Sequence, residues 1–229
     1  MVAFGTGRNL TEGDRTDTAV QSIYSVLDNT RYKLASGKVV EDRTAAIPTA
    51  VGTGVTNLQQ QTVGATAIDG QAQSAARDFW TVSQNSVSYQ GTGAKKGWYL
   101  NLPQSGERVL DQMAFFDSSN IIEVISEAPA SGSSTAEESC APPPTQQKTF
   151  RTLLNIMDGK KPSVQVMDRN GDGVYDISAD DGVSRMTAST TENPLRTKGL
   201  EIRKGADGIV DNLRRMPELP LRPSWRQLQ

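Results

Sequence analysis

The sequence of 229 residues contains no histidine and only one cysteine, Cys140. Without histidine, neither a Ser-His-Asp nor a Cys-His catalytic arrangement can form. Almost all catalytic zinc sites and His-ligated haem are excluded on the same ground. A lone cysteine permits no intrachain disulfide and no cysteine-based metal cluster. These absences indicate a protein that is not an enzyme.

The chain also lacks a long apolar segment and a concentrated basic patch. No apolar run approaches the roughly 20 residues that a membrane span requires, so none is expected. The net charge is −2 and the basic residues are scattered. Their densest group, Arg214, Arg215, Arg222 and Arg226, is interrupted by prolines and by Glu218. Nucleic acid is therefore not expected as a partner.

The first residues carry none of the features of a secretory signal peptide. Met1 is followed by strand-like residues and a glycine turn at residues 5–7, with no basic start and no apolar stretch after it. We expect that the true N-terminus, with any signal peptide, lies elsewhere. The chain then corresponds to the C-terminal portion of a longer protein.

Short strands joined by turns dominate the pattern that remains. Gly, Ser, Thr, Asn, Gln and Asp are plentiful, whereas long helix-forming runs are scarce. The sequence therefore predicts an all-β fold. Strands are expected at residues 2–7, 21–27, within 38–68, 78–89, 97–102, within 148–183 and within 199–229, together with a polar loop at 8–18, a hairpin with arms 109–116 and 121–125, and a short helix at 210–215.

Residues 128–147 form a low-complexity segment rich in Ala, Ser, Glu and Pro. Such a segment cannot bury enough apolar surface to offset the entropy lost on ordering. We expect a flexible, exposed loop. It contains Cys140, which is either a free thiol or the partner of a cysteine outside this chain.

An acidic loop at residues 168–176, with the sequence DRNGDGVYD, carries the spacing of a calcium site. Side-chain oxygens stand at loop positions one, three, five and nine, and the Val174 carbonyl falls at position seven. Gly173 occupies position six, where the loop must turn sharply. Calcium takes six to eight oxygen ligands, and it turns the mutual repulsion of three carboxylates into attraction. The predicted ligands are Asp168, Asn170, Asp172, the Val174 carbonyl and Asp176.

Two features separate this loop from an EF-hand. Position twelve is Ala179 rather than a bidentate glutamate, and residues 163–167 alternate like a strand rather than an entering helix. Asp180 or Asp181 could supply a late ligand, or waters could complete the shell. A weak affinity follows, roughly 10⁻⁴–10⁻³ M. The competing interpretation is an Asx-rich surface turn, because Asn-Gly and Asp-Gly are strong turn formers.

Four segments, taken together and in order, resemble one protein family. They are residues 4–8 with 21–28, residues 97–103 (GWYLNLP) with 105–109, the acidic loop 168–176, and residues 224–228 (SWRQL). The family comprises the PilY/PilC adhesins and biogenesis factors associated with the tip of the type IV pilus. The resemblance spans nearly the whole chain, so residues 1–229 are treated as one C-terminal portion of a PilY-type domain.

The resemblance implies a β-propeller, of which 229 residues supply about three blades and leave it incomplete. It also implies an extracellular, pilus-associated location on the bacterial surface. The implied partners are pilus components such as minor pilins, and a host-surface receptor. In the family, calcium occupancy regulates pilus extension against retraction as well as adhesion. Two alternatives stay open: a quinoprotein-like propeller enzyme, and a carbohydrate- or matrix-binding module stiffened by calcium.

Overall fold

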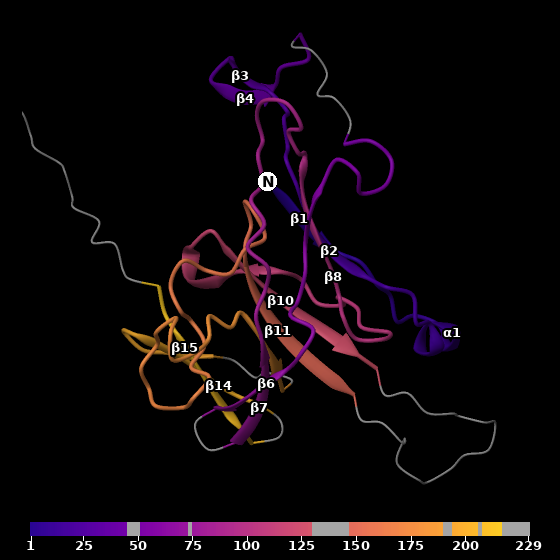
Figure 1. Cartoon of the computed structure of the whole chain (residues 1–229). Helices are drawn as coiled ribbons and strands as arrows, with labels where there is room; N and C mark the ends of the chain where they lie inside the picture. Colours follow the sequence, from indigo (N-terminus) through magenta and orange to yellow (C-terminus); the bar gives the residue numbers. More distant parts are fainter. Residues whose placement is uncertain (45–50, 73–74, 130–146, 190–193, 206–207, 217–229) are drawn as a thin grey trace, which may run out of the picture.

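The computed structural model describes residues 1–44, 51–72, 75–129, 147–189, 194–205 and 208–216. Within them the chain is almost entirely β-structure, with one short helix, α1 (Glu12–Thr16), and one 3₁₀ turn, η1 (Phe116–Ser118). The strands form sheets of four, six, three and two strands (Figure 1). No helix among these residues is long and apolar enough to cross a bilayer.

The four-stranded sheet has the order β1-β2-β8-β5, which is β1 (Val2–Gly5), β2 (Ser22–Val26), β8 (Gly97–Asn101) and β5 (Gln59–Gln61). Its pairs are antiparallel except for β5 with β8, which run parallel. Alternation along the strands separates two faces. Ile23, Trp98 and Leu100 are buried. On the opposite face Phe4, Tyr24 and Tyr99 stack across neighbouring strands.

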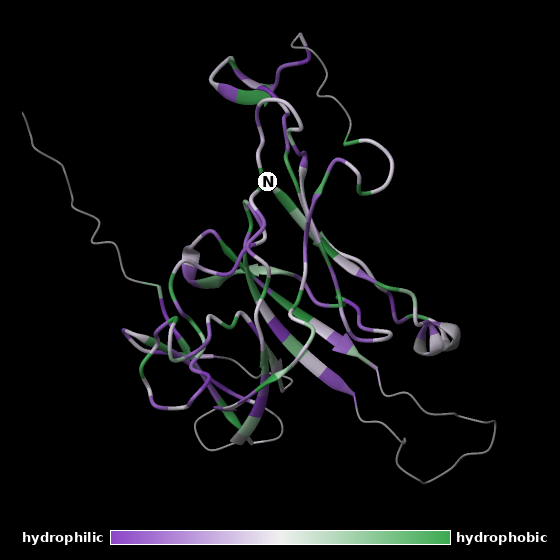
Figure 2. Ribbon diagram, viewed as in Figure 1, coloured by the Kyte–Doolittle hydropathy of each residue, from purple (hydrophilic) through white to green (hydrophobic). Residues whose placement is uncertain are grey.

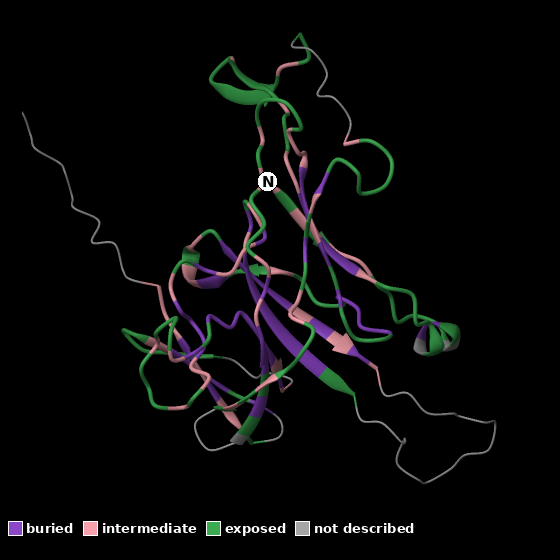
Figure 3. Ribbon diagram, viewed as in Figure 1, coloured by how far each residue is buried: buried purple, intermediate pink, exposed green. Residues whose placement is uncertain are grey.

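The six-stranded sheet forms the centre of the molecule. Its order is β6 (Ile68–Ala72), β7 (Ala75–Trp80), β12 (Arg185–Ala188), β11 (Lys148–Asn155), β10 (Ile121–Ala128) and β9 (Ala114–Phe115). β10 and β11 pair antiparallel over eight residues each and are buried along most of their length (Figure 3). Hydrophobic and hydrophilic residues interleave along both strands, as Figure 2 shows. The central strands are therefore covered on both faces, and each face includes buried charged groups, Glu123 with Arg151 on one and Glu107 with Arg185 on the other.

Two smaller sheets complete the fold. A three-stranded antiparallel sheet contains β13 (Leu195–Arg196), β14 (Leu200–Lys204) and β15 (Val210–Arg214). A separate hairpin pairs β3 (Tyr32–Ala35) with β4 (Lys38–Glu41) and is largely exposed. An isolated hairpin has little stability of its own, whereas the three-stranded sheet packs against the centre of the molecule.

Two apolar clusters hold the layers together from opposite faces of the central sheet. One joins Ile122, Val124 and Leu154 to Ile23, Trp98 and Leu100 of the four-stranded sheet. The other joins Ile121 and Leu153 to Val166, Met167 and Leu213. Because successive residues of a strand face opposite ways, Ile121 and Ile122 reach different clusters. The second cluster anchors the segment that leads into the acidic loop.

The predicted all-β, propeller-like fold is confirmed, but several elements differ from their prediction. The short helix predicted at 210–215 is wrong, since Val210–Arg214 is strand β15. The polar loop 8–18 contains α1, and the strand expected over 78–89 ends at Trp80. The predicted hairpin exists with a shorter first arm, because β9 is Ala114–Phe115. Most of the predicted flexible loop 128–147, including Cys140, lies outside the described residues.

Candidate metal site

The acidic loop begins where a buried segment reaches the surface. Val166 and Met167 are 2% and 1% exposed, and Met167 forms an isolated antiparallel bridge with Leu213. Asp168 follows at once and is half-buried, whereas Asn170, Asp172 and Asp176 are exposed. The strand predicted for residues 163–167 is thus reduced to one bridging residue. That bridge fixes the start of the loop.

Asp168 organises the first half of the loop through its carboxylate. The backbone N–H of Gly171 donates to Oδ1 at 2.7 Å, and the N–H of Gly173 donates to Oδ2 at 2.8 Å. Both glycines have positive φ, 74° and 80°. The chain can turn this tightly because glycine adopts that conformation without steric cost. Position one of the predicted site therefore lies at the centre of the turn.

The other predicted ligands lie on the same loop but make local contacts. Asp172 accepts the Val174 N–H at Oδ1 at 2.7 Å, and its Oδ2 accepts from Asn170 Nδ2 at 3.0 Å. Asp176 accepts the Ala179 N–H at 2.6 Å. Among the described residues, no three acidic or cysteine side chains converge closely enough to hold a metal. A cation held by all the predicted ligands would therefore require the Asp172 and Asp176 side chains to rotate away from these backbone partners.

Asp180 joins the two ends of the loop, a role that its spacing alone did not reveal. Its side chain is buried, and its carboxylate accepts the Arg169 N–H at 2.7 Å and the Asp176 N–H at 3.1 Å. Asp181 instead pairs with Arg169, Nε to Oδ2, at 2.9 Å and is half-exposed. Of the two late ligands considered from the sequence, Asp180 contacts the loop backbone, whereas Asp181 contacts only the Arg169 side chain among the interactions described.

The loop concentrates negative charge. The loop contains three aspartates, Asp180 and Asp181 follow shortly after it, and the one arginine in this segment is Arg169. Burial raises the pKa of Asp180, and the Asp168 charge raises it further, against the lowering effect of its backbone hydrogen bonds. Burial and the carboxylates of Asp168 and Asp180 raise the pKa of Tyr175 to about 12. The oxygen donors and this charge fit a hard divalent cation, which would supply the neutralising charge.

For the predicted calcium site, lowering the pH is expected to weaken cation binding before ordinary carboxyls titrate. Because the pKa of Asp180 is raised, the proton returns to it above the usual aspartate value of about 4. A proton on Asp180 removes negative charge at the base of the loop, so protons and calcium compete. Calcium titrations at a series of pH values should show an affinity that is constant near neutrality and falls as the pH approaches that raised pKa. An affinity that is unchanged down to pH of about 4 would contradict this.

Comparison of the sequence with protein-family models gives no match, and comparison with curated proteins gives none either. Comparison with solved structures finds the C-terminal domain of PilY1 from Pseudomonas aeruginosa, with a TM-score of 0.61 and 20% sequence identity. The alignment covers 94% of this chain and 41% of that domain's chain. This chain thus spans well under half the length of the structure it matches. At the level of the fold, residues 1–229 are similar to the C-terminal domain of PilY1.

Proposed function

We propose that this chain is the calcium-binding part of a type IV pilus-associated surface protein and that it has no catalytic activity. The observation that carries the proposal is the geometry of the acidic loop. The Asp168 carboxylate accepts the N–H groups of Gly171 and Gly173, and residues with side-chain oxygens stand at alternate positions after it. The likeness in fold to the PilY1 domain supports the pilus association. The lack of histidine and of a second cysteine supports the absence of catalysis.

In this proposal the protein works outside the cell, with pilus components such as minor pilins and a host-surface receptor as partners. Asp168, Asp172 and Asp176 would hold the calcium ion, whose charge would neutralise their carboxylates and draw them together. The Asp172 and Asp176 side chains, no longer bonded to backbone N–H groups, would then hold the loop in a single conformation. That conformation would favour one way of binding to the pilus. Calcium occupancy thereby regulates pilus extension, retraction and adhesion.

Replacing Asp172 by alanine is expected to weaken calcium binding by about tenfold or more, because one charged oxygen ligand is lost. Isothermal titration calorimetry measures the affinity directly. Asp181→Asn is the matched control, since it removes one negative charge close to the loop at a residue that pairs with Arg169. We expect it to change the affinity much less. Equal calcium affinity in Asp172→Ala and the unmodified protein, together with unchanged calcium-dependent piliation, would refute the proposal.

A calcium-stiffened carbohydrate-binding module is the second candidate, and one observation favours it. The outer face of the four-stranded sheet presents a row of Phe4, Tyr24 and Tyr99, with ring centroids 5.3 and 6.1 Å apart. The exposed amides of Gln60 and Asn101 lie on the paired strands beside this row. Aromatic rings with adjacent amides can bind sugars. A glycan array, compared with pilus counts in a deletion strain, separates the two candidates.

A further inference from the structure

The acidic loop is held from one side by strand β6, at the edge of the central sheet. The N–H of Gln71 donates to the Arg169 carbonyl at 2.7 Å. In return, Arg169 Nη1 donates to the Asp69 carbonyl at 3.0 Å. Between them Gly70 approaches so closely that a Cβ there would stand 2.5 Å from the Arg169 carbonyl oxygen. The second loop residue is therefore fixed against the central sheet.

From the other side the loop is held by β15 of the three-stranded sheet. Met167 bridges to Leu213, and the N–H of Arg214 donates to the Val166 carbonyl at 2.9 Å. The Arg214 side chain also reaches the Tyr175 carbonyl, with Nη1 at 3.3 Å. These contacts fall immediately before Asp168 and immediately before Asp176. Both ends of the predicted ligand set are thus attached to β15.

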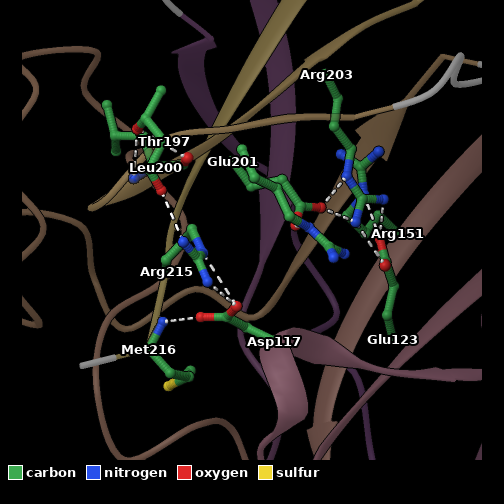
Figure 4. Close-up of polar contacts among 10 residues, drawn as sticks. Asp117, Glu123, Arg151, Thr197, Leu200, Glu201, Arg203, Arg215 and Met216 are labelled. Carbon is green, nitrogen blue, oxygen red and sulfur yellow. Dashed lines mark hydrogen bonds and ion pairs between the residues drawn. The ribbon is translucent and has the colours of Figure 1, made fainter. Parts of the chain in front are cut away.

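Much of the remaining contact between the three-stranded sheet and the centre is ionic (Figure 4). Arg203 donates to Glu123, with Nη2 and Oε2 at 2.8 Å, and Asp211 accepts from Arg77 and Arg151. Just after β15, next to the residues that contact the loop, Asp117 accepts from Arg215 at 2.8 Å and from the Met216 N–H at 2.8 Å. Buried ion pairs add little net stability, because desolvation offsets their attraction. The docking of this sheet is therefore sensitive to modest changes elsewhere.

We propose that the acidic loop couples calcium occupancy to the docking of the three-stranded sheet β13–β15. Asp168, Asp172 and Asp176 would hold the cation, and shared binding to it would order the segment between Met167 and Tyr175. That segment carries the backbone contacts of β15, so an ordered loop holds the sheet against the centre. Coupling of this kind is reciprocal, and a docked sheet strengthens calcium binding by the same factor. The inference rests on the proposed calcium site and names what the site controls.

Hydrogen–deuterium exchange of the full chain, with calcium and with a chelator, measures the docking directly. We expect saturating calcium to slow exchange of β14 and β15 amides by about tenfold, since opening then requires release of the ion. Amides of β2 and β8, which do not contact the loop, should change little. Calorimetry on the same samples reports whether the loop binds calcium at all.

Two substitutions test the reciprocal effect without altering a predicted ligand. Asp117→Asn removes the ion pair with Arg215, which follows directly after β15, and asparagine tolerates the left-handed backbone of this residue, φ 47°. It should weaken calcium binding about fivefold. Arg214→Met removes the donor to Tyr175 and should reduce the calcium-induced protection of β15. Lys204→Met, at an exposed position of β14, is the matched control.

The outcomes separate failure of the coupling from failure of the site. If calcium binds but slows exchange only within residues 168–176, the coupling is wrong and the calcium site stands. If calorimetry detects no calcium binding, or detects binding that Asp172→Ala leaves unchanged, the proposed site is wrong. The coupling is then wrong as well. Normal calcium affinity in an Asp117→Asn protein whose β15 exchanges faster would also overturn the coupling. Slower exchange in β14 and β15, with weakened binding in Asp117→Asn, supports it.

Discussion

Replacing Glu107 by alanine is expected to lower the free energy of unfolding by about 3–5 kcal/mol, because it strands a buried charge. Glu107 and Arg185 are both fully buried, and Arg185 Nη2 donates to Glu107 Oε1 at 2.7 Å. The same oxygen accepts from Ser126 Oγ at 2.5 Å, and Oε2 accepts the Gln104 N–H at 3.1 Å. Alanine leaves all three donors without this acceptor. Urea unfolding followed by fluorescence measures the loss.

The geometry around Arg185 supplies the control for this prediction. Its guanidinium also lies over Phe150, 4.1 Å from the ring centroid, so the side chain has apolar as well as polar neighbours. In the double variant Glu107→Met with Arg185→Met, no charge remains unpaired, and most of the stability should return. Should the double variant be as unstable as the sum of the two single variants, loss of packing rather than an unpaired charge would be the cause.

Replacing Trp98 by alanine is expected to cost a similar amount, about 3–5 kcal/mol, by leaving a cavity in the first apolar cluster. Trp98 is 0% exposed and its Nε1 donates to the Ile156 carbonyl at 2.9 Å. Gly159 lies against the indole so closely that a Cβ there would stand 2.5 Å from a ring carbon. The indole therefore joins the four-stranded sheet to the turn that follows β11. The midpoint of urea unfolding tests this.

Two substitutions on the same strand separate the contributions of Trp98. Trp98→Phe keeps an aromatic ring but loses the indole donor, so it should cost less than the alanine variant. Tyr99→Ala removes a neighbouring ring that is only half-buried and faces the opposite side of the sheet. It should cost only about 1 kcal/mol. An equal loss in Tyr99→Ala and Trp98→Ala would contradict the inward-facing assignment.

Glu107 and Trp98, whose replacement has the largest expected effects on stability, both lie in residues 97–109. Much of the family resemblance rests on this segment. Its residues hold layers together rather than forming a site: Trp98 fills a core, Glu107 balances Arg185, and Arg108 donates to the carbonyls of Arg8, Asp14 and Asp17. The resemblance therefore reports an architecture, in agreement with the likeness to the PilY1 domain. The proposed function, calcium binding, rests on a different segment, the acidic loop.

Local sequence was enough to predict strands β1, β2 and β8 and the acidic loop. Each depends on contacts between residues close in the chain: alternation of faces, glycine turns, and an aspartate whose carboxylate reaches N–H groups three and five residues later. The same kind of reasoning failed at residues 210–215. There the backbone groups pair with β14 and with Val166, partners that no local pattern records. Tertiary pairing overrode the local preference.

The sequence by itself determined that histidine-dependent catalysis and intrachain disulfides are excluded, that the fold is built from short strands, and that side-chain oxygens recur at alternate positions in residues 168–172. Only the tertiary structure decided that Asp180 rather than Asp181 contacts the loop backbone, and that the loop lies between β6 and β15. The physical reason is the range of the interactions. A tight turn is satisfied by its own backbone, whereas a buried carboxylate is placed by donors that only the folded chain brings near.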